Sequence, residues 1–297
     1  MIPRILVSGV SGPIGAALLP HLYRDYEVVR LVRGPAAGKD QISWDPAKAL
    51  ASDAVSGFAA VIHLAGESII GRWTAAKKAK IRDSRVAGTG HLAQALAQAK
   101  QKPRVFVCSS AIGYYGSRGD ELLNENSAPG TGFLADVCRD WEGATKPAID
   151  AGIRTAQIRT GIVLSPRGGA LAKMLTPFKL GLGGRLGDGR QWMSWIDVKD
   201  MVGGILHILK NDQLQGPVNM VAPNPVTNAE FTRTLAGVLR RPAIFPVPAF
   251  AVKAAFGEMG EAILLGSQRV EAARLVSAGY PFRFSDLESS LKNIVQR

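Results

Sequence analysis

The chain has 297 residues, of which 46% are hydrophobic and 20% charged, and its formal net charge is +12. Such a composition is typical of a globular protein with one large domain or two unequal ones, and it excludes a low-complexity chain. The two cysteines, Cys108 and Cys138, lack metal-ligand spacing, and no signal peptide or membrane-length apolar run is visible. We therefore expect no metal site, no membrane partner and a reducing, cytoplasmic setting.

The positive charge raises the question of a nucleic-acid partner. Lysine and arginine are, however, spread evenly, with 18 in residues 1–150 and 18 in residues 151–297. The densest basic group lies in residues 77–85, and no nucleic-acid motif accompanies it. The charge therefore favours an anionic cofactor or substrate over nucleic acid.

The first predicted strand, Ile5-Leu6-Val7, leads into a glycine turn, and a helical pattern follows over residues 16–23. The turn reads Gly9-Val10-Ser11-Gly12-Pro13-Ile14-Gly15. Here Gly9 suits a tight turn, Gly12 lets a pyrophosphate approach the main chain, and Gly15 allows close helix packing. The N–H groups at the helix start then face an anion. Strand, turn and helix together predict a dinucleotide site, although the spacing G-x-x-G-x-x-G differs from that of many dehydrogenases.

The second predicted strand, residues 27–32, ends where NAD enzymes usually carry an acidic residue for the ribose hydroxyls. This chain has Arg33 there instead. A guanidinium suits a 2′-phosphate, so the sequence favours NADP over NAD, with a solvated loop arginine as the alternative.

A short third strand is predicted over residues 41–44, and Asp45-Pro46 is expected to open a helix. The fourth strand, residues 59–64, ends in Leu64-Ala65-Gly66-Glu67, a small-residue turn on the ligand side of an open α/β sheet. We interpret His63, inside this apolar strand, as structural. A long helix is expected over residues 74–100.

The fifth strand, residues 104–108, leads into Ser109-Ser110 and then Tyr114-Tyr115-Gly116. Hydroxyl groups just beyond such a strand can hydrogen-bond a substrate, although a cap or a turn is the alternative. A helix is expected over residues 133–150 and a sixth strand over residues 155–159. This strand–helix alternation predicts a Rossmann-type, doubly wound parallel sheet.

Beyond the sixth strand the pattern changes. The glycines between positions 168 and 189 predict a mobile or tightly turning region, and Pro217 to Val221 one more strand. Thr227-Asn228-Ala229-Glu230 predicts a capped helix to Leu239. Residues 249–297 read as mostly helical, with a last helix starting near Asp286. We expect an NADP-binding domain over 1–165 with parts of 190–225, and a smaller substrate-side helical region over 166–190 and 226–297.

Several stretches together resemble the extended short-chain dehydrogenase/reductase superfamily, and more closely its epimerase-like group with a C-terminal domain of unknown function. These stretches are Ser8-Gly9-x-x-Gly12-x-x-Gly15, Leu64-Ala65-Gly66-Glu67, Ser84-Arg85, residues 177–184, Trp195-Ile196, Val221-Ala222-Pro223 and residues 227–231. The resemblance covers nearly the whole chain. It implies the fold and a dinucleotide contact through Ser109, the glycine turn and residues 64–67.

The resemblance also exposes a departure. The superfamily uses Tyr-x-x-x-Lys, in which the tyrosine moves a proton and the lysine holds the nicotinamide ribose. In the superfamily a glutamate usually follows four residues after this lysine. If Glu142 is that glutamate, Leu134 occupies the tyrosine position and Cys138 the lysine position. Ser110, Tyr114 and Tyr115 remain as candidate catalytic residues.

Arg85 falls where related enzymes often carry an asparagine near the nicotinamide, which implies an anion contact, with a surface ion pair as the alternative. Three functions stay open: an NADP(H)-dependent oxidoreductase or epimerase-like enzyme, a non-catalytic NADP(H)-binding or redox-sensing module that acts through a protein partner, and a nucleic-acid binder. The first is favoured. Superfamily members often dimerise through helices that here lie near 74–100 and 133–150. The basic charge on the first of them favours a monomer or weak homodimer.

Overall fold

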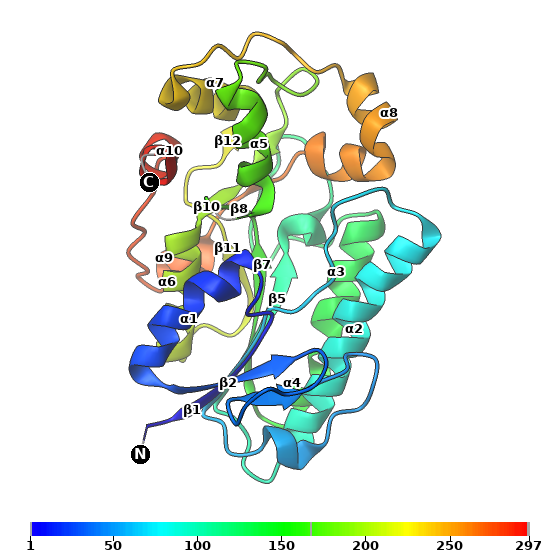
Figure 1. The fold of residues 1–297 in the computed structure, drawn as a ribbon, viewed down its shortest axis with the longest axis vertical. Helices are drawn as coiled ribbons and strands as arrows, with labels where there is room; N and C mark the ends of the chain where they lie inside the picture. Colours follow the sequence, from blue (N-terminus) through cyan, green and yellow to red (C-terminus); the bar gives the residue numbers. More distant parts are fainter. Residues whose placement is uncertain (1, 167, 296–297) are drawn as a thin grey trace.

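The structure is a computed structural model that describes residues 2–166 and 168–295. Its centre is a seven-stranded sheet in the order β11-β7-β5-β4-β1-β2-β3, in which all neighbouring strands run parallel (Figure 1). The strands are β1 (Arg4–Ser8), β2 (Glu27–Val32), β3 (Gln41–Ser43), β4 (Ala60–His63), β5 (Val105–Ala111), β7 (Arg154–Thr160) and β11 (Gly216–Met220). The predicted fold class, a Rossmann-type doubly wound sheet, is confirmed.

Helices cover both faces of this sheet (Figure 1). On one face lie α1 (Pro13–Asp25) and α6 (Val198–Lys210), and on the other lie α2 (Ala75–Gln98), α3 (Phe133–Gly143) and α4 (Lys146–Asp150). Successive side chains of β1 alternate between two cores: Ile5 and Val7 pack toward α1 and α6, and Leu6 packs toward α2. A strand buried on both faces needs a continuous apolar run, and residues 5–7 supply it.

The C-terminal part builds a further layer beyond the carboxyl ends of the strands, at the top of Figure 1. Its helices are α5 (Gly169–Lys179), α7 (Asn228–Leu239), α8 (Ala249–Met259) and α10 (Leu287–Val295), and a π-helical turn spans Gly260–Leu264. Trp195, Phe231 and Leu291 are fully buried in its separate core. The short helix α9 (Ala273–Ser277) instead packs beside β11 at the edge of the sheet. The predicted capping box is present, because Thr227 and Glu230 bond each other's backbone N–H groups at 3.2 and 2.8 Å.

Short strand pairs connect this layer to the sheet. They are β8 (Ile162–Leu164) with β10 (Trp195–Asp197), β9 (Trp192–Met193) with β12 (Val226–Thr227), and β6 (Leu122–Leu123) with β13 (Arg269–Val270). Single 3₁₀ turns span Ser52–Val55 and Ile112–Tyr115. None of the helices in the described part of the chain combines the length and apolar composition that crossing a membrane requires.

Three local predictions were wrong. No helix follows Asp45, whose side chain closes a turn by accepting the Ala47 N–H at 3.0 Å. The helix predicted over 133–150 is two helices, because Pro147 has no N–H to bond the Gly143 carbonyl. Within the glycine-rich stretch, residues 169–179 form α5, because the apolar residues between the glycine groups bury one helical face.

Candidate active site

A cleft of about 400 Å³ opens at the carboxyl ends of β1, β2 and β4. This is the edge where open parallel sheets bind ligands. Eight of the predicted cofactor contacts line it: Gly9, Ser11, Gly12, Arg33, Leu64, Ala65, Gly66 and Glu67. Pro13, Ile14 and Gly15 form the first turn of α1 directly behind this lining. The structure thus brings three separate sequence segments together around one cleft.

Two of the three glycines of the turn are required by the fold, and the third is not. A Cβ on Gly9, which has φ +74°, would lie 2.5 Å from the Leu64 carbonyl carbon, and one on Gly15 would lie 2.5 Å from the Gly9 oxygen. The fold itself therefore needs both. A Cβ on Gly12 would meet only the Gly9 oxygen, at 3.4 Å, and its φ of −76° suits any residue. Its missing side chain instead leaves open the space in front of the α1 N-terminus.

The charge around the cleft favours an anion. Arg33 is exposed at the end of β2 and has no ion pair among the described residues, whereas Arg30 pairs with Asp40. The one carboxylate in the lining, Glu67, bonds Lys77 Nζ at 2.7 Å. That hydrogen bond, together with the charges of Lys77 and the more distant Arg33, lowers the pKa of Glu67. Glu67 thus stays ionised, and the positive charge of Lys77 offsets its negative charge within the cleft.

Arg85 projects from α2 toward the loop that follows β4. Its Nη1 donates to the Glu67 carbonyl at 2.9 Å, and its guanidinium lies 5.0 Å from the Trp141 ring centre. The side chain also approaches Gly66, where a Cβ would lie 3.2 Å from Cζ, and its charge acts on Cys138 of α3. The neighbouring Ser84 Oγ accepts the Glu67 N–H at 3.0 Å. The Ser84-Arg85 pair therefore fixes the loop that forms one wall of the cleft.

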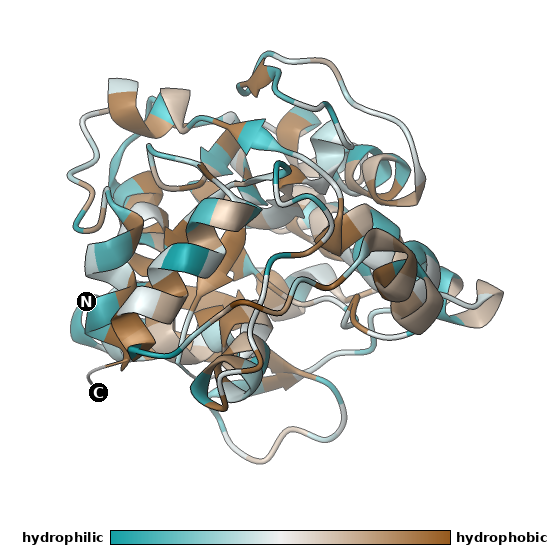
Figure 2. Cartoon of the chain, turned by 90° about the horizontal axis from the view of Figure 1, so that it is seen from above, coloured by the Kyte–Doolittle hydropathy of each residue, from teal (hydrophilic) through white to brown (hydrophobic). Residues whose placement is uncertain are grey.

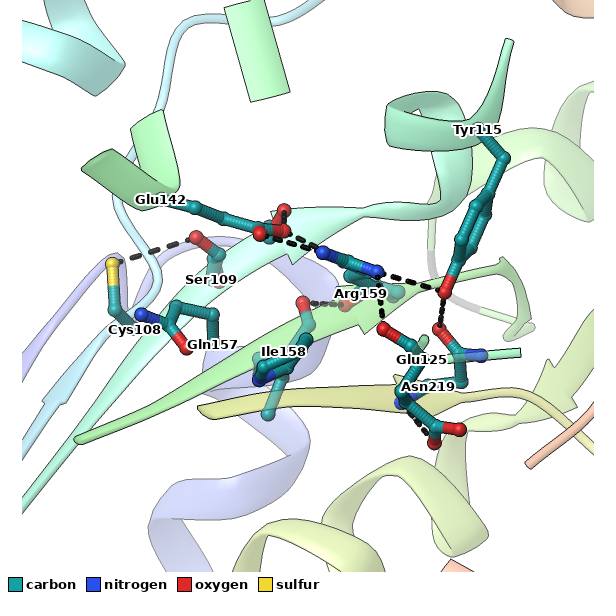
Figure 3. Close-up of polar contacts among 12 residues, drawn as sticks. Cys108, Ser109, Tyr115, Glu125, Glu142, Gln157, Ile158, Arg159 and Asn219 are labelled. Carbon is teal, nitrogen blue, oxygen red and sulfur yellow. Dashed lines mark hydrogen bonds and ion pairs between the residues drawn. The ribbon is translucent and has the colours of Figure 1, made fainter. Parts of the chain in front are cut away.

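A buried polar network occupies the carboxyl ends of β5 and β7 (Figure 3). Arg159 forms a two-pronged bond with Glu142, Nε to Oε1 and Nη2 to Oε2, both at 2.8 Å. Ser110 donates to the same carboxylate at 2.6 Å. Arg159 Nη1 also donates to the Tyr115 hydroxyl at 3.0 Å, and that hydroxyl donates to Asn219 at 2.7 Å. Side chains from four distant segments thus satisfy one another in the interior.

This network changes the standing of the candidate catalytic residues. Tyr115 is fully buried, and burial raises the pKa of its hydroxyl to about 12. Ser110 is also buried and belongs to β5, which continues to Ala111 instead of ending at Cys108. Both hydroxyls therefore point into the network and away from solvent. Tyr114 is half-buried, with its ring centre 3.5 Å from the Arg159 guanidinium and no hydrogen-bond partner for its hydroxyl in the described part of the chain.

The expected tyrosine and lysine positions both lie on α3. Leu134 packs over Gly113, where a Cβ would lie 3.3 Å from the Leu134 Cβ. Cys138 is buried, and this burial raises the pKa of its thiol to about 12. None of the five tyrosines of the sequence has a lysine four residues later. The helix therefore presents an alkyl group and a neutral thiol, and the nearby cation is Arg85 of α2.

A second cleft, of about 620 Å³, lies between α3 and the C-terminal layer. Gly113, Gly132 and Leu134 line its sheet side, and Ala249 and Lys253 of α8 line its other side. A larger hollow of about 990 Å³ lies at the amino ends of β7 and β11. We place the candidate substrate site in the 620 Å³ cleft because it adjoins α3. The 990 Å³ hollow lies at the opposite, amino-terminal edge of the strands.

Sequence reasoning missed the residues that support the site. It did not identify Lys77, which neutralises Glu67, or Arg159, which binds Glu142. A lysine in a basic helical stretch carries no distinguishing signal. An arginine inside a predicted strand does, because an unpaired charge is rarely buried, and that signal was available for Arg159.

Comparison with known proteins places this geometry in context. Residues 5–221 match the model of the NAD dependent epimerase/dehydratase family, and residues 247–294 match a domain of unknown function, DUF1731. Epimerase family protein ML0860 of Mycobacterium leprae is 40% identical over 99% of this chain and 96% of its own length. Human epimerase family protein SDR39U1 is 37% identical over 98% of this chain and 99% of its own. The crystal structure of human SDR39U1 isoform 2 with NADPH has a TM-score of 0.91 and 35% identity, covering 99% of both chains.

Proposed function

This chain belongs to the NAD dependent epimerase/dehydratase family, and on that premise we propose that it binds NADP(H) in the cleft beside Gly12 and Arg33. We propose further that it is an oxidoreductase or epimerase-like enzyme whose active site lacks the Tyr-x-x-x-Lys pair. A small molecule would be its substrate. A cytoplasmic monomer or weak homodimer is the expected form.

The observation that carries the cofactor proposal is the combination of an open glycine and an unpaired arginine in one cleft. Gly12 has no structural need to be glycine, so its missing side chain is explained by a ligand that approaches the main chain at the α1 N-terminus. Arg33, at the end of β2, suits a 2′-phosphate. NADPH in the related human SDR39U1 structure supports the same choice.

The chain's own residues would divide the remaining work. The nicotinamide, when bound, supplies or accepts a hydride. Arg85 is placed to contribute the positive charge that the family's lysine would provide, because it lies beside Cys138 and Gly66. Tyr114 remains the candidate proton donor. Ser109, which lies within β5 and does not line the cleft, stays a candidate cofactor contact. Burial in the network removes Tyr115 and weakens the case for Ser110.

The network also favours a second candidate function, a non-catalytic NADP(H)-binding module that acts through a protein partner. Ser110 and Tyr115 already bond Glu142 and Asn219, and α3 offers Leu134 and Cys138 where a proton donor and a cation are expected. A redox sensor must bind the oxidised and reduced cofactors with different affinities, because equal affinity shifts no equilibrium. An enzyme must instead turn over.

The cofactor proposal is tested by calorimetric titration of the purified protein with NADPH, NADP, NADH and NAD, alongside Arg33→Ala. We expect Arg33→Ala to weaken NADPH binding at least tenfold and to leave NADH binding unchanged, because only NADPH carries the 2′-phosphate. Lys39→Ala, an exposed cation of the same loop outside the cleft lining, is the matched control and should change NADPH affinity less than threefold. Equal affinity for NADPH and NADH, unaffected by Arg33→Ala, would overturn the assignment.

Turnover separates the two candidate functions. Consumption of NADPH with a panel of carbonyl and sugar-nucleotide compounds, lost in Tyr114→Phe at unchanged NADPH affinity, supports the enzyme. No consumption across the panel, with NADPH and NADP affinities that differ at least tenfold, supports the binding module instead.

A further inference from the structure

One end of the molecule carries a concentration of exposed apolar side chains. Six large ones expose between 45% and 75% of their surface, out of twelve such residues in the whole described chain. They are Leu180, Leu182, Ile244, Phe245, Phe250 and Phe256. All six lie on two short segments, residues 179–187 and 240–256. We call these segments together the apolar–basic surface.

The two segments run side by side. The Val247 N–H donates to the Arg185 carbonyl at 2.8 Å, and the Gly187 N–H donates to the Val247 carbonyl at 2.9 Å. A Cβ on Gly181 would lie 3.5 Å from the Pro242 ring. In Figure 1 the second segment crosses the top of the molecule between α7 and α8. Figure 2 views the molecule from above this end, and brown apolar segments there alternate with teal hydrophilic ones.

The same end is strongly basic. Residues 179–187 and 240–256 contain five lysine and arginine residues and no acidic ones, and among the described residues Lys253 alone of these cations pairs with a nearby carboxylate, that of Glu261. This surface therefore carries +5 of the chain's net charge of +12. Lys179, Arg240 and Arg241 are exposed, and none of them has a carboxylate within ion-pair distance in the part of the chain that the structure describes. The even spread of charge along the sequence therefore hides a concentration in space.

We propose that this apolar–basic surface docks on an anionic lipid bilayer. Leucine, isoleucine and phenylalanine side chains enter the headgroup region, where burying apolar area is favourable, and the unpaired cations meet lipid phosphates. A second copy of the chain fits less well, because a two-fold contact would bring two surfaces of charge +5 together. Nucleic acid would satisfy the cations but would leave the aliphatic side chains in water.

This proposal departs from the sequence-based expectation of no membrane partner, which rested on the lack of a long apolar run. It is independent of the cofactor. It also gives the substrate cleft a location, because Ala249 and Lys253 of α8 line that cleft while Phe250 and Phe256 of the same helix face outward. Docking would place the mouth of the cleft at the bilayer surface.

The test is co-sedimentation of the full chain with large unilamellar vesicles of phosphatidylcholine alone or with 30% phosphatidylglycerol. We expect binding to the anionic vesicles, at least tenfold weaker binding to phosphatidylcholine, and loss of most binding in 1 M NaCl. No binding to anionic vesicles at low salt would overturn the proposal.

Two variants locate the contact. Ile244→Ser with Phe250→Ser removes apolar contact, and Arg240→Gln with Arg241→Gln removes charge, and each should weaken vesicle binding about tenfold or more. The apolar control combines Ile149→Ser with Val276→Ser, and the charge control combines Lys100→Gln with Lys102→Gln; all four residues are exposed and lie outside the apolar–basic surface. Both controls should retain vesicle binding. All variants are exposed, so each should melt close to the unmodified protein. Controls that lose binding equally would refute the assigned surface.

Two further readouts exclude the other occupants. Sedimentation velocity could show a dimer that dissociates when Ile244→Ser is combined with Phe250→Ser. That result would identify a second copy of the chain as the occupant. Binding of a single-stranded RNA that the same variant weakens more than vesicle binding would identify nucleic acid. Either outcome contradicts the bilayer proposal.

Discussion

The cofactor cleft and the helix α3 border the same sheet, yet they match the sequence-based expectations to different degrees. The cleft has its three glycines, its helix N-terminus and an unpaired Arg33. On α3, Leu134 and Cys138 stand where the family's tyrosine and lysine are expected, and a buried Arg159–Glu142 pair fills the space beneath. We therefore expect substitutions to affect dinucleotide binding and proton transfer separately.

The physical reason lies in what each region is made of. Backbone geometry forms the cleft, so it depends on where glycines allow the chain to turn and on the direction of α1. Proton transfer depends on single side chains at fixed positions, which can be replaced without disturbing the sheet. In this region the Glu142 carboxylate bonds an arginine and a serine of the interior. Substitutions in the two regions should consequently have different signatures.

The largest expected effect comes from Arg159→Leu. Removal of the guanidinium leaves the carboxylate of Glu142 buried without its partner, which costs about 3–5 kcal/mol in the free energy of unfolding. Lys146→Leu, which breaks the exposed pair with Asp150, should cost less than about 0.5 kcal/mol. Urea unfolding measures both. A loss below about 1 kcal/mol for Arg159→Leu would contradict a stabilising role for the Arg159–Glu142 pair.

The next effect is the acid sensitivity of the cofactor region. Burial lowers the pKa of His63 to about 4, and its Nδ1 lies 2.6 Å from the Ser8 hydroxyl, linking β4 to β1 below the cleft. The unfolded chain binds this proton below pH 6.5 and the folded chain only near pH 4, so stability is complete above pH 6.5 and falls as the pH drops toward 4.

Unfolding of the unmodified protein at pH 5 should therefore require about 2 kcal/mol less than at pH 8 on account of this histidine. His63→Gln, which cannot titrate, should show a correspondingly flatter pH profile. Identical profiles for the two proteins would show that His63 is not the group responsible.

Gly12→Ala separates binding from folding. The added Cβ meets only the Gly9 oxygen at 3.4 Å, so the melting temperature should change by no more than about 2 °C. A pyrophosphate that approaches this atom would be displaced, so NADPH affinity should fall at least tenfold. Gly90→Ala, a helical glycine with open space around it, is the control and should bind NADPH normally. Unchanged affinity in Gly12→Ala would place the cofactor elsewhere.

The smallest effect distinguishes the adjacent tyrosines. Tyr115→Phe leaves hydrogen-bonding groups of Asn219 and Arg159 unsatisfied and should lower the free energy of unfolding by about 1 kcal/mol. Tyr114→Phe removes a hydroxyl without a described partner and should change it by less than about 0.5 kcal/mol. Turnover with any active substrate should respond in the opposite order. A rate loss confined to Tyr115→Phe would reverse the assignment.

Much of the cleft could be predicted from the sequence because its determinants are local. Residues 9–15 contain their own turn and helix start, and the end of β2 is fixed by a short apolar run. The network could not be predicted, because Ser110, Glu142, Arg159 and Asn219 meet only after strands far apart in the chain are placed side by side. The helix α5 was also missed, because its flanking glycines suggested turns. The exposure of the apolar side chains at residues 179–187 and 240–256 could not be predicted either. Tertiary packing decides whether an apolar side chain is buried or faces solvent.

A crystal structure of the protein with NADPH reports on both regions in one density map. We expect the pyrophosphate in front of the α1 N-terminus at Gly12, the 2′-phosphate within hydrogen-bond distance of Arg33, and the nicotinamide end beside Gly66 and Arg85. We also expect the Arg159–Glu142 bond to stay intact. A 2′-phosphate remote from Arg33, or a Glu142 carboxylate released from Arg159 to contact the nicotinamide ribose, would contradict these expectations.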